Sequence, residues 1–222
     1  YIKVHYPIEF MTALMHADLD NTDRITVDIQ EAERMGFEVL PPNVNSSSVN
    51  FQPLGKDKIV FGMGAIKNVG VQVVEAIVAA RAEKGEFQNL DDLVDKVGVE
   101  NLAKRALESL IKVGAMDDFG ERNQLLAVLP GIMEKAGKNQ KMAAIGQIGM
   151  FGQGATKGDK PSTPATQLPD LPELPDSQKV RWEKDLMGVY ISTHPLDEFF
   201  WAKLLPDYRD ASAIADLREN AK

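Results

Sequence analysis

Cysteine is absent from the 222 residues of this chain. Disulfides and thiolate chemistry are therefore excluded, and the composition fits a reducing cytoplasm. The three histidines, His5, His16 and His194, lie too far apart in the sequence for the spacing of a metal site. No apolar run approaches the roughly 18 residues of a transmembrane helix. The chemistry that is left belongs to carboxylates, amides, basic side chains and the backbone.

The charge is unevenly distributed along the chain. A net charge of −8 argues against a nucleic-acid-binding surface that covers the whole molecule. Residues 1–50 carry 3 basic and 8 acidic side chains, and residues 116–222 carry 13 and 16, whereas residues 51–115 carry 9 of each. The acidity lies outside the middle segment, so a local contact with DNA is compatible with the composition.

The first 64 residues predict helices followed by a small β-hairpin. Pro7 is typical of a first helical position, and the cap Asn21-Thr22-Asp23 predicts a second helix that ends at Gly36. An extended run, FEVLPPNVN, comes next. The stretch VNFQPLGKDKIVFG then predicts two short strands joined by a turn at Gly55-Lys56-Asp57. The chain begins at Tyr1 without a signal-peptide pattern, so we expect a piece of a longer protein.

From residue 65 onward the pattern is helical again, which makes the expected fold class mainly α. Pro130 is expected to kink or break the last of the helices predicted over 71–84, 102–113 and 121–144. Residues 152–176 are rich in Gly, Pro, Ser and Thr and predict a mobile linker. Further helices are expected beyond it, with a short extended segment at 189–191. The resulting segments are 1–64, 65–146, 147–176 and 177–222.

The run AIKNVGVQVVEAI contains a tight turn, Lys67-Asn68-Val69-Gly70, before a helix that begins at Val71. Asn tolerates a left-handed backbone best after glycine, and Gly70 can adopt a conformation closed to other residues. Free N–H groups at the helix start, the helix dipole and the charge of Lys67 would together favour a phosphate oxygen. Such a contact does not reach base edges, so binding would be independent of base sequence. The alternative is that Gly70 only permits a sharp corner.

A second turn, Lys112-Val113-Gly114, again places glycine after a helix, with Lys104 and Arg105 one to two turns earlier. Two such turns could hold backbone phosphates at two places on a duplex. The pair resembles a tandem helix-hairpin-helix DNA-binding domain.

Longer motifs carry a more specific resemblance. FGMGAIKNVG, RAEKGEFQNLDDLVDKV and LAKRALESLIKVGAMDDFG resemble the alpha subunits of bacterial DNA polymerase III, the C-family replicative polymerases, and the match covers nearly the whole chain. HYPIEFMTALM and ERMGFEVLPPNVN resemble the end of that family's fingers region. DLMGVYISTHPLDEF resembles the segment ahead of its oligonucleotide-binding barrel.

The resemblance implies a role for each segment. Residues 1–64 would be the distal fingers, 65–146 the tandem helix-hairpin-helix domain with a following long helix, and 177–222 the approach to a barrel outside this chain. Residues 147–176 would hold a clamp-binding motif and the linker. The implied partners are double-stranded DNA, the sliding clamp and other replicase subunits, in the cytoplasm and without a membrane.

The chain lacks the motif of the family's catalytic aspartates, which belong to an upstream palm domain. The resemblance therefore implies Mg²⁺ for the parent polymerase but no catalytic residue, metal or cofactor in this fragment. Asp91-Asp92 and Asp117-Asp118 are acidic pairs of the kind used in two-metal chemistry. Both pairs fall at expected helix starts, where aspartate caps free N–H groups, and we expect capping.

The run Gln147-Ile148-Gly149-Met150-Phe151-Gly152 places two bulky apolar side chains where no core is expected, which is typical of a segment that docks into a partner. It resembles the family's internal clamp-binding motif. Gln147 would hydrogen-bond the clamp, and Met150 with Phe151 would fill its hydrophobic cleft. The alternative is that Phe151 folds back onto the preceding helix.

Two other functions stay open at this point. One is a stand-alone, non-enzymatic helix-hairpin-helix scaffold for DNA binding or repair. The other is a protein-interaction module in which the hairpins are purely structural.

Overall fold

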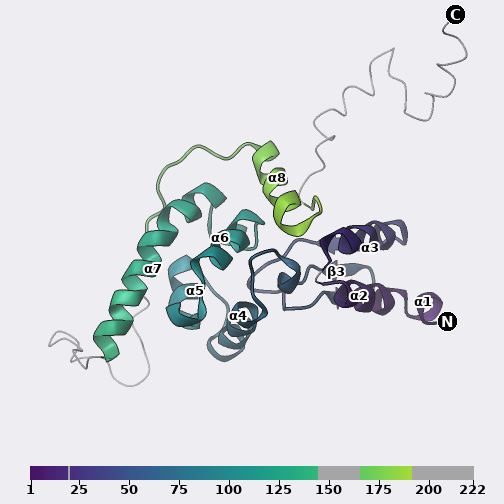
Figure 1. Cartoon of the computed structure of the whole chain (residues 1–222), viewed down its shortest axis with the longest axis horizontal. Coiled ribbons are helices and arrows are strands. Elements are labelled where there is room, and N and C mark those ends of the chain that lie inside the picture. Colours follow the sequence, from purple (N-terminus) through teal and green to yellow (C-terminus); the bar gives the residue numbers. More distant parts are fainter. Residues whose placement is uncertain (20, 145–165, 192–222) are drawn as a thin grey trace, which may run out of the picture.

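The structure, a computed structural model, describes residues 1–19, 21–144 and 166–191. Residues 1–62 form helices and a small sheet, and residues 63–144 form a helical part beside them (Figure 1). A further helix, α8 (Asp176–Met187), is hydrogen-bonded to both parts. The fold is mainly α-helical, as predicted.

The N-terminal helices begin and end where the sequence favours it. Pro7 is the first residue of its helix, and the side-chain oxygen of Asn21 accepts a hydrogen bond from the backbone N–H of Arg24 at 3.2 Å. Gly36 follows the third helix with a φ of +90°, a conformation that favours glycine. The helices are α1 (Ile2–His5), α2 (Pro7–Ala17) and α3 (Thr22–Arg34).

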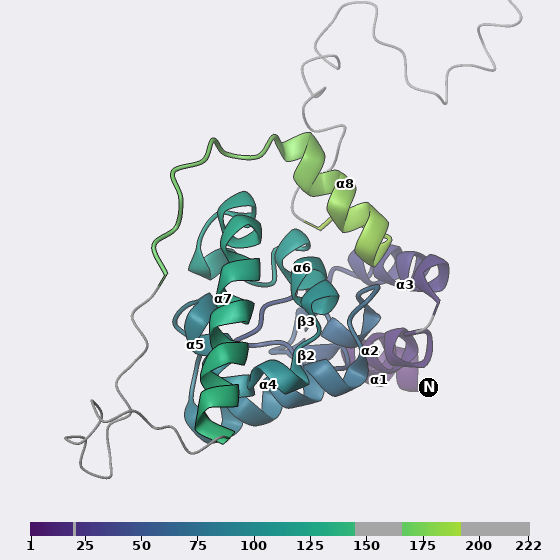
Figure 2. The ribbon, with the colours of Figure 1, turned by 60° about the vertical axis from the view of Figure 1, so that its left-hand side comes forward.

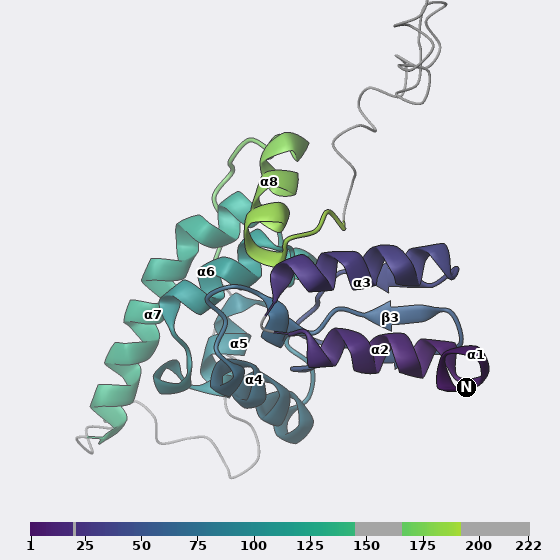
Figure 3. The same ribbon diagram turned by 45° about the vertical axis from the view of Figure 1, so that its right-hand side comes forward.

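The sheet has three strands, β1 (Glu38–Leu40), β2 (Gln52–Leu54) and β3 (Lys58–Val60). The antiparallel pairing of β2 with β3 confirms the predicted hairpin. The extended run before it also joins the sheet, because β1 pairs in parallel with β3 and places Val39 opposite Ile59. Helices α2 and α3 contact each other and the strands (Figure 3). The predicted hairpin is thus part of a mixed sheet.

The helical part packs its long helices side by side. Helix α4 contacts α5, and both α5 and α6 contact α7 (Figure 2). Helix α7 continues through Pro130, where the sequence predicted a kink or break. The elements are η1 (Met63–Ala65), α4 (Val71–Lys84), α5 (Leu90–Val97), η2 (Val99–Asn101), α6 (Lys104–Lys112), η3 (Asp117–Phe119) and α7 (Arg122–Ala144).

One hydrophobic core extends through both parts. It runs from Met11 and Ile25 under the sheet, through Phe61 and Met63, to the helices that carry Leu110 and Leu129. Most of these side chains are fully buried, and burial of each contributes on the order of 1.5–3 kcal/mol. The segments between α4 and α6 are therefore held against the sheet and against each other.

Residues 166–175, predicted as part of a mobile linker, have defined contacts instead. Thr166 donates its backbone N–H and its hydroxyl to the carboxylate of Asp91, at 2.9 and 2.8 Å. The side-chain amide of Asn123 donates to the carbonyl of Pro172. These contacts attach the segment to α5 and α7 before α8 begins. None of the helices in residues 1–19, 21–144 and 166–191 combines the length and apolar character needed to cross a membrane.

Candidate nucleic-acid interface

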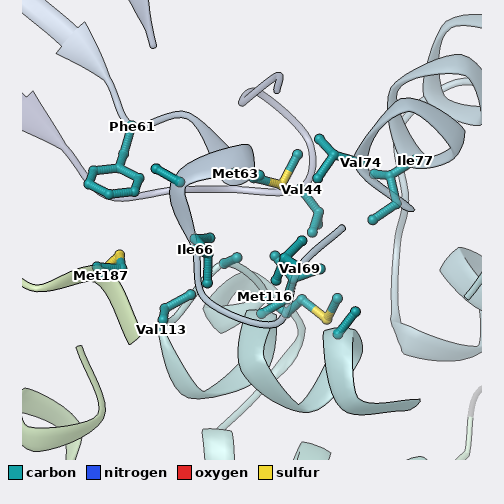
Figure 4. Packing of buried hydrophobic residues seen from close by; sticks show 14 of the residues in the cluster. Val44, Phe61, Met63, Ile66, Val69, Val74, Ile77, Val113, Met116 and Met187 are labelled. Atoms are coloured by element: carbon teal, nitrogen blue, oxygen red, sulfur yellow. The ribbon is translucent and has the colours of Figure 1, made fainter. Parts of the chain in front are cut away.

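The first hairpin consists of η1, the turn Ile66–Gly70 and helix α4. Ile66 and Val69 are buried, at 2% and 6% exposure, and they point toward Val113 and Met116 (Figure 4). Between and beside these two anchors, Lys67, Asn68 and Gly70 are exposed. The alternation of buried and exposed residues fixes the turn to the core while its polar edge faces outward.

Asn68 has a φ of +68°, the left-handed conformation predicted for it. Asparagine adopts this conformation more readily than other side-chain-bearing residues do. Its side-chain nitrogen donates to the hydroxyl of Ser109 on α6 at 3.5 Å. The turn is thus tied to the helix of the neighbouring hairpin.

The backbone conformation of Gly70 differs from the one predicted. Its φ of −70° and ψ of 144° are open to every residue, so the expected special conformation is wrong. A Cβ placed on Gly70 would meet no heavy atom within 4 Å. Neither the backbone nor the packing of the described residues therefore requires a glycine at this exposed position.

The start of α4 offers free backbone donors. The first bonds of this helix run from the N–H groups of Val73 and Val74 to the carbonyl of Gly70. Within the described part of the chain, the N–H groups of Gly70, Val71 and Gln72 have no acceptor. Three unpaired donors at the positive end of a 14-residue helix form the arrangement that binds anions.

A second hairpin joins α5 to α6, and its turn runs from Gly98 to Ala103. Residues 66–77 align with residues 99–110 in the shared pattern apolar–x–Asn–apolar–small. Each turn is closed by a backbone bond between equivalent residues, since Val69 donates to Ile66 at 3.1 Å and Leu102 donates to Val99 at 3.3 Å. The two turns differ at the asparagine, because Asn68 has a left-handed φ whereas Asn101 ends the 3-10 helix η2. The second turn was not identified from the sequence.

Ala103 takes the position of Gly70 in this second hairpin. It precedes α6 with a φ of −78° and a ψ of 128°. Lys104 and Arg105 are the first two residues of α6, and within the described residues their backbone N–H groups have no acceptor. The predicted basic pair therefore lies at a helix start. The only ion pair described for it is a loose one, 3.8 Å from the exposed Lys104 to the half-buried Glu108.

The turn Lys112-Val113-Gly114 does not offer donors in the predicted way. Gly114 has a φ of +83° and ends α6, but its N–H donates to Ile111 and that of Ala115 donates to Leu110. Val113 is 1% exposed and donates to Ser109. This turn is a helix end whose donors are satisfied internally, and the prediction of a second phosphate-binding turn here is wrong.

The acidic pairs serve mainly as structural partners. Asp117 binds Arg122 at 2.9 Å, Asp118 accepts from the side chain of Asn43 at 2.7 Å, and Asp91 holds Thr166. Capping was the wrong expectation for these three. Asp92 accepts from the N–H of Gln88 just ahead of α5, but the residue that caps this helix is Asn89, whose side chain accepts from the N–H of Asp92. In the described residues no three His, Asp or Glu side chains form a group that could hold a metal ion.

Arg122 is the centre of a buried network beneath the second hairpin's helix. Its guanidinium is paired with Asp117 and with Glu183 of α8 and donates to the carbonyl of Lys112. Burial opposes its charge, but the hydrogen bonds and charges of the two carboxylates raise the pKa of Arg122 above its usual value. No local pattern in the sequence indicates this network. The predicted clamp-binding residues Gln147, Met150 and Phe151 lie outside the described residues.

The helix-hairpin-helix assignment has independent support. A family model described as the helix-hairpin-helix motif matches residues 36–125, which contain both hairpins. The match also includes the sheet and ends before α8.

Curated relatives match the chain along its length. The DNA polymerase III subunit alpha of Campylobacter jejuni is 34% identical over 225 residues, which cover 100% of this chain and 18% of the relative. The subunit of Thermus aquaticus is 37% identical over 196 residues, 88% of this chain and 15% of the relative. That of Escherichia coli is 36% identical over 200 residues, 90% and 17%. The chain therefore spans less than a fifth of the length of these relatives.

Proposed function

Because the chain is homologous over its length to one segment of the DNA polymerase III alpha subunits, we propose that it serves such a polymerase by binding duplex DNA through backbone phosphates. The relatives carry the name of a DNA polymerase, and the matched motif is one that binds DNA. The parent enzyme would be a DNA-directed DNA polymerase at work in the cytoplasm during replication. Within it, this segment binds DNA and does not catalyse nucleotide addition.

The free donors at Gly70 are the observation that carries the proposal. Gly70 is exposed, has an ordinary backbone conformation and faces open space, yet it is followed by N–H groups without acceptors. A phosphate oxygen that approaches these groups closely would explain why a side chain is absent. The nearby Lys67 adds a charge that solvent screens.

The second hairpin supplies a related contact in which basic side chains contribute more and the bare backbone contributes less. Ala103 leaves less room than glycine, but Lys104 and Arg105 at the start of α6 provide two positive charges. Two helix starts on one rigid unit would bind phosphates at two places on a duplex. Since neither uses base edges, the proposed binding is independent of base sequence.

Mg²⁺ would be the cofactor of the parent polymerase. The described residues contain no group of acidic or histidine side chains suited to it, and the family's catalytic aspartates have no counterpart in this sequence. Nucleotide addition therefore has no step assigned to this chain.

We also propose that Gln147, Met150 and Phe151 tether the polymerase to its sliding clamp. The support is the motif itself, a glutamine followed by a bulky apolar pair. Tethering raises the effective concentration of the polymerase at DNA, so even a weak peptide contact is useful. Replacing Met150 and Phe151 by alanine should abolish capture by the immobilised clamp and leave DNA binding unchanged.

The DNA contact is tested by fluorescence anisotropy on two duplexes of unrelated sequence across a salt series. Both duplexes should give the same affinity, with a log–log salt slope on the order of −2 to −4. Replacing Lys104 and Arg105 by alanine should make the slope shallower by about 1 to 2. The matched control replaces Lys56 and Lys58 of the β2–β3 hairpin, which removes the same charge from the N-terminal part and should leave the slope nearly unchanged. A marked preference for one duplex would contradict the backbone-phosphate mechanism.

A further inference from the structure

Helix α8 supports the first hairpin directly. The backbone N–H of Lys67, in the exposed turn, donates to the carbonyl of Leu186 near the end of α8 at 3.0 Å. The corresponding position of the second hairpin, Glu100, has no such bond within the described residues. The orientation of the peptide between Ile66 and Lys67 thus depends on a helix that lies far away in the sequence.

The end of α8 is also fixed to the N-terminal part. The hydroxyl of Thr26 on α3 donates to the carbonyl of Gly188 at 3.1 Å. Met187, next to it, belongs to the hydrophobic core and lies near the first hairpin (Figure 4). Helix α8 therefore joins α3, the hairpin turn and the helical part at one place.

Glu183 attaches α8 to α7 through a buried ion pair. Its carboxylate lies 3.2 Å from Arg122, and the two side chains are 1% and 5% exposed. The second carboxylate oxygen accepts the N–H of Ile191 at 3.2 Å, so Glu183 also holds the chain that follows α8. When Glu183 is neutralised, Asp117 still pairs with Arg122, but the charge-assisted bond that joins α8 to α7 becomes a weaker neutral one. Neutralising Glu183 would therefore weaken the attachment of α8 to α7.

We propose that α8 orients the first hairpin for DNA, and that Glu183, through its pairing with Arg122, is a positioning residue for that contact. The inference rests on the proposed function, but it extends the DNA-binding unit beyond residues 36–125 of the matched motif. Residues on both sides of the segment 145–165 then belong to one unit.

The test compares Glu183→Gln with Asp185→Asn in the full 222-residue chain. Both changes remove one negative charge from the same helix, but the side chain of Asp185 is 65% exposed. Duplex affinity is measured by anisotropy, and exchange of the Lys67 amide is measured by NMR. We expect Glu183→Gln to weaken binding about tenfold, because the loosened turn must be ordered again on DNA. Asp185→Asn should stay within about twofold of the wild type.

The exchange data separate positioning from general destabilisation. In Glu183→Gln the amides of Lys67 and α8 should exchange faster, while those inside α6, such as Leu110, keep their protection. Unchanged exchange at Lys67, or wild-type affinity despite faster exchange, would overturn the inference. If Glu183→Gln does not fold, Thr26→Val can be used instead, because it removes a hydrogen bond to the same end of α8 without removing a charge. It should show the same effects more weakly, and their absence would overturn the inference.

Failure of the proposed function gives a different result. If the wild type does not bind duplex DNA at low salt, the DNA part of both proposals is wrong. Exchange at Lys67 would then still decide whether α8 holds the hairpin turn.

Discussion

Gly70 and Ala103 occupy equivalent positions at the starts of α4 and α6, with φ values of −70° and −78° and ψ values of 144° and 128°. In each case a buried apolar residue precedes, Val69 or Leu102, and unpaired N–H groups follow. The two hairpins thus present the same kind of helix start, although only the first turn has a left-handed asparagine. The first has a bare backbone beside Lys67, and the second has an alanine beside two basic residues.

The two hairpin-region glycines should respond oppositely to alanine. Gly70→Ala meets open space at an ordinary φ, so it should leave the free energy of unfolding unchanged or raise it by about 0.4–1 kcal/mol. Gly114→Ala forces φ +83° on an alanine and places its Cβ against the Arg122 guanidinium and 2.7 Å from Asp117. It should lower the free energy of unfolding by about 2 kcal/mol or more. Urea denaturation checks both values. An equal loss of stability in the two variants would contradict the conclusion that Gly114 requires glycine and Gly70 does not.

Asn68 should tolerate glycine better than alanine. The φ of +68° costs an alanine roughly 1–2 kcal/mol and costs glycine nothing. Asn68→Gly should therefore keep most of the stability in urea denaturation, and Asn68→Ala should lose about 1 kcal/mol more. Both variants remove the weak contact with Ser109, so their difference reports on the backbone alone.

Thr166→Val should release the segment 166–175 from α5. It removes the hydroxyl donor to the buried Asp91 and preserves side-chain shape, and a hydrogen bond to a charged group contributes about 1.5–3 kcal/mol. The backbone amide of Thr166 should then exchange faster, and proteases should cut within 166–175 sooner. The exposed neighbour Gln167 is the control, because Gln167→Ala removes no described contact. Equal protection in both variants would show that the contact with Asp91 is dispensable.

Asp28→Asn should stabilise the protein at neutral pH and not in acid. Burial and the nearby Asp18 carboxylate raise the pKa of Asp28 above 3.8, and within the described residues its Oδ2 atom has no hydrogen-bond partner. Its favourable contribution is fully present below pH 3.8 and is lost as the pH rises through the raised pKa. At pH 7 the variant should gain roughly 1 kcal/mol in the free energy of unfolding. Denaturation at several pH values should show this gain shrinking toward pH 4, and a gain of the same size at every pH would contradict the prediction.

Local signals predicted much of this fold, and contacts between distant segments account for the rest. Pro7, Asn21 and Gly36 mark helix ends through their own conformational limits, and Asn68 was placed correctly for the same reason. The pairing of β1 with β3 and the bonds of Asp91 to Thr166 join segments whose partners no local pattern names. Acidic residues near helix starts were taken for caps because capping is local, but two of the four have partners elsewhere in the chain and Asp117 pairs with Arg122.

The candidate site shows the same division. The sequence prediction used glycine to locate the hairpin turns. It therefore placed the second turn at Gly114 instead of at Ala103. The repeat of an asparagine between two apolar residues, at Asn68 and Asn101, was the pattern that would have located the second turn. The support from Glu183 and Leu186 was not predictable, because α8 follows a segment whose composition suggested a separate, mobile linker.

The proposed contact between a DNA phosphate and the N–H groups at the start of α4 is tested most directly by comparing two variants. These are Gly70→Val and Gly131→Val, and the measurement is their duplex affinity at low salt. Both glycines face open space, so neither change should disturb the fold, and urea denaturation verifies this. Valine at position 70 would cover the free N–H groups at the start of α4, whereas position 131 lies within α7. We expect a loss of affinity of about tenfold for Gly70→Val and little change for Gly131→Val. Wild-type affinity in a folded Gly70→Val would show that the first hairpin is only a corner between helices.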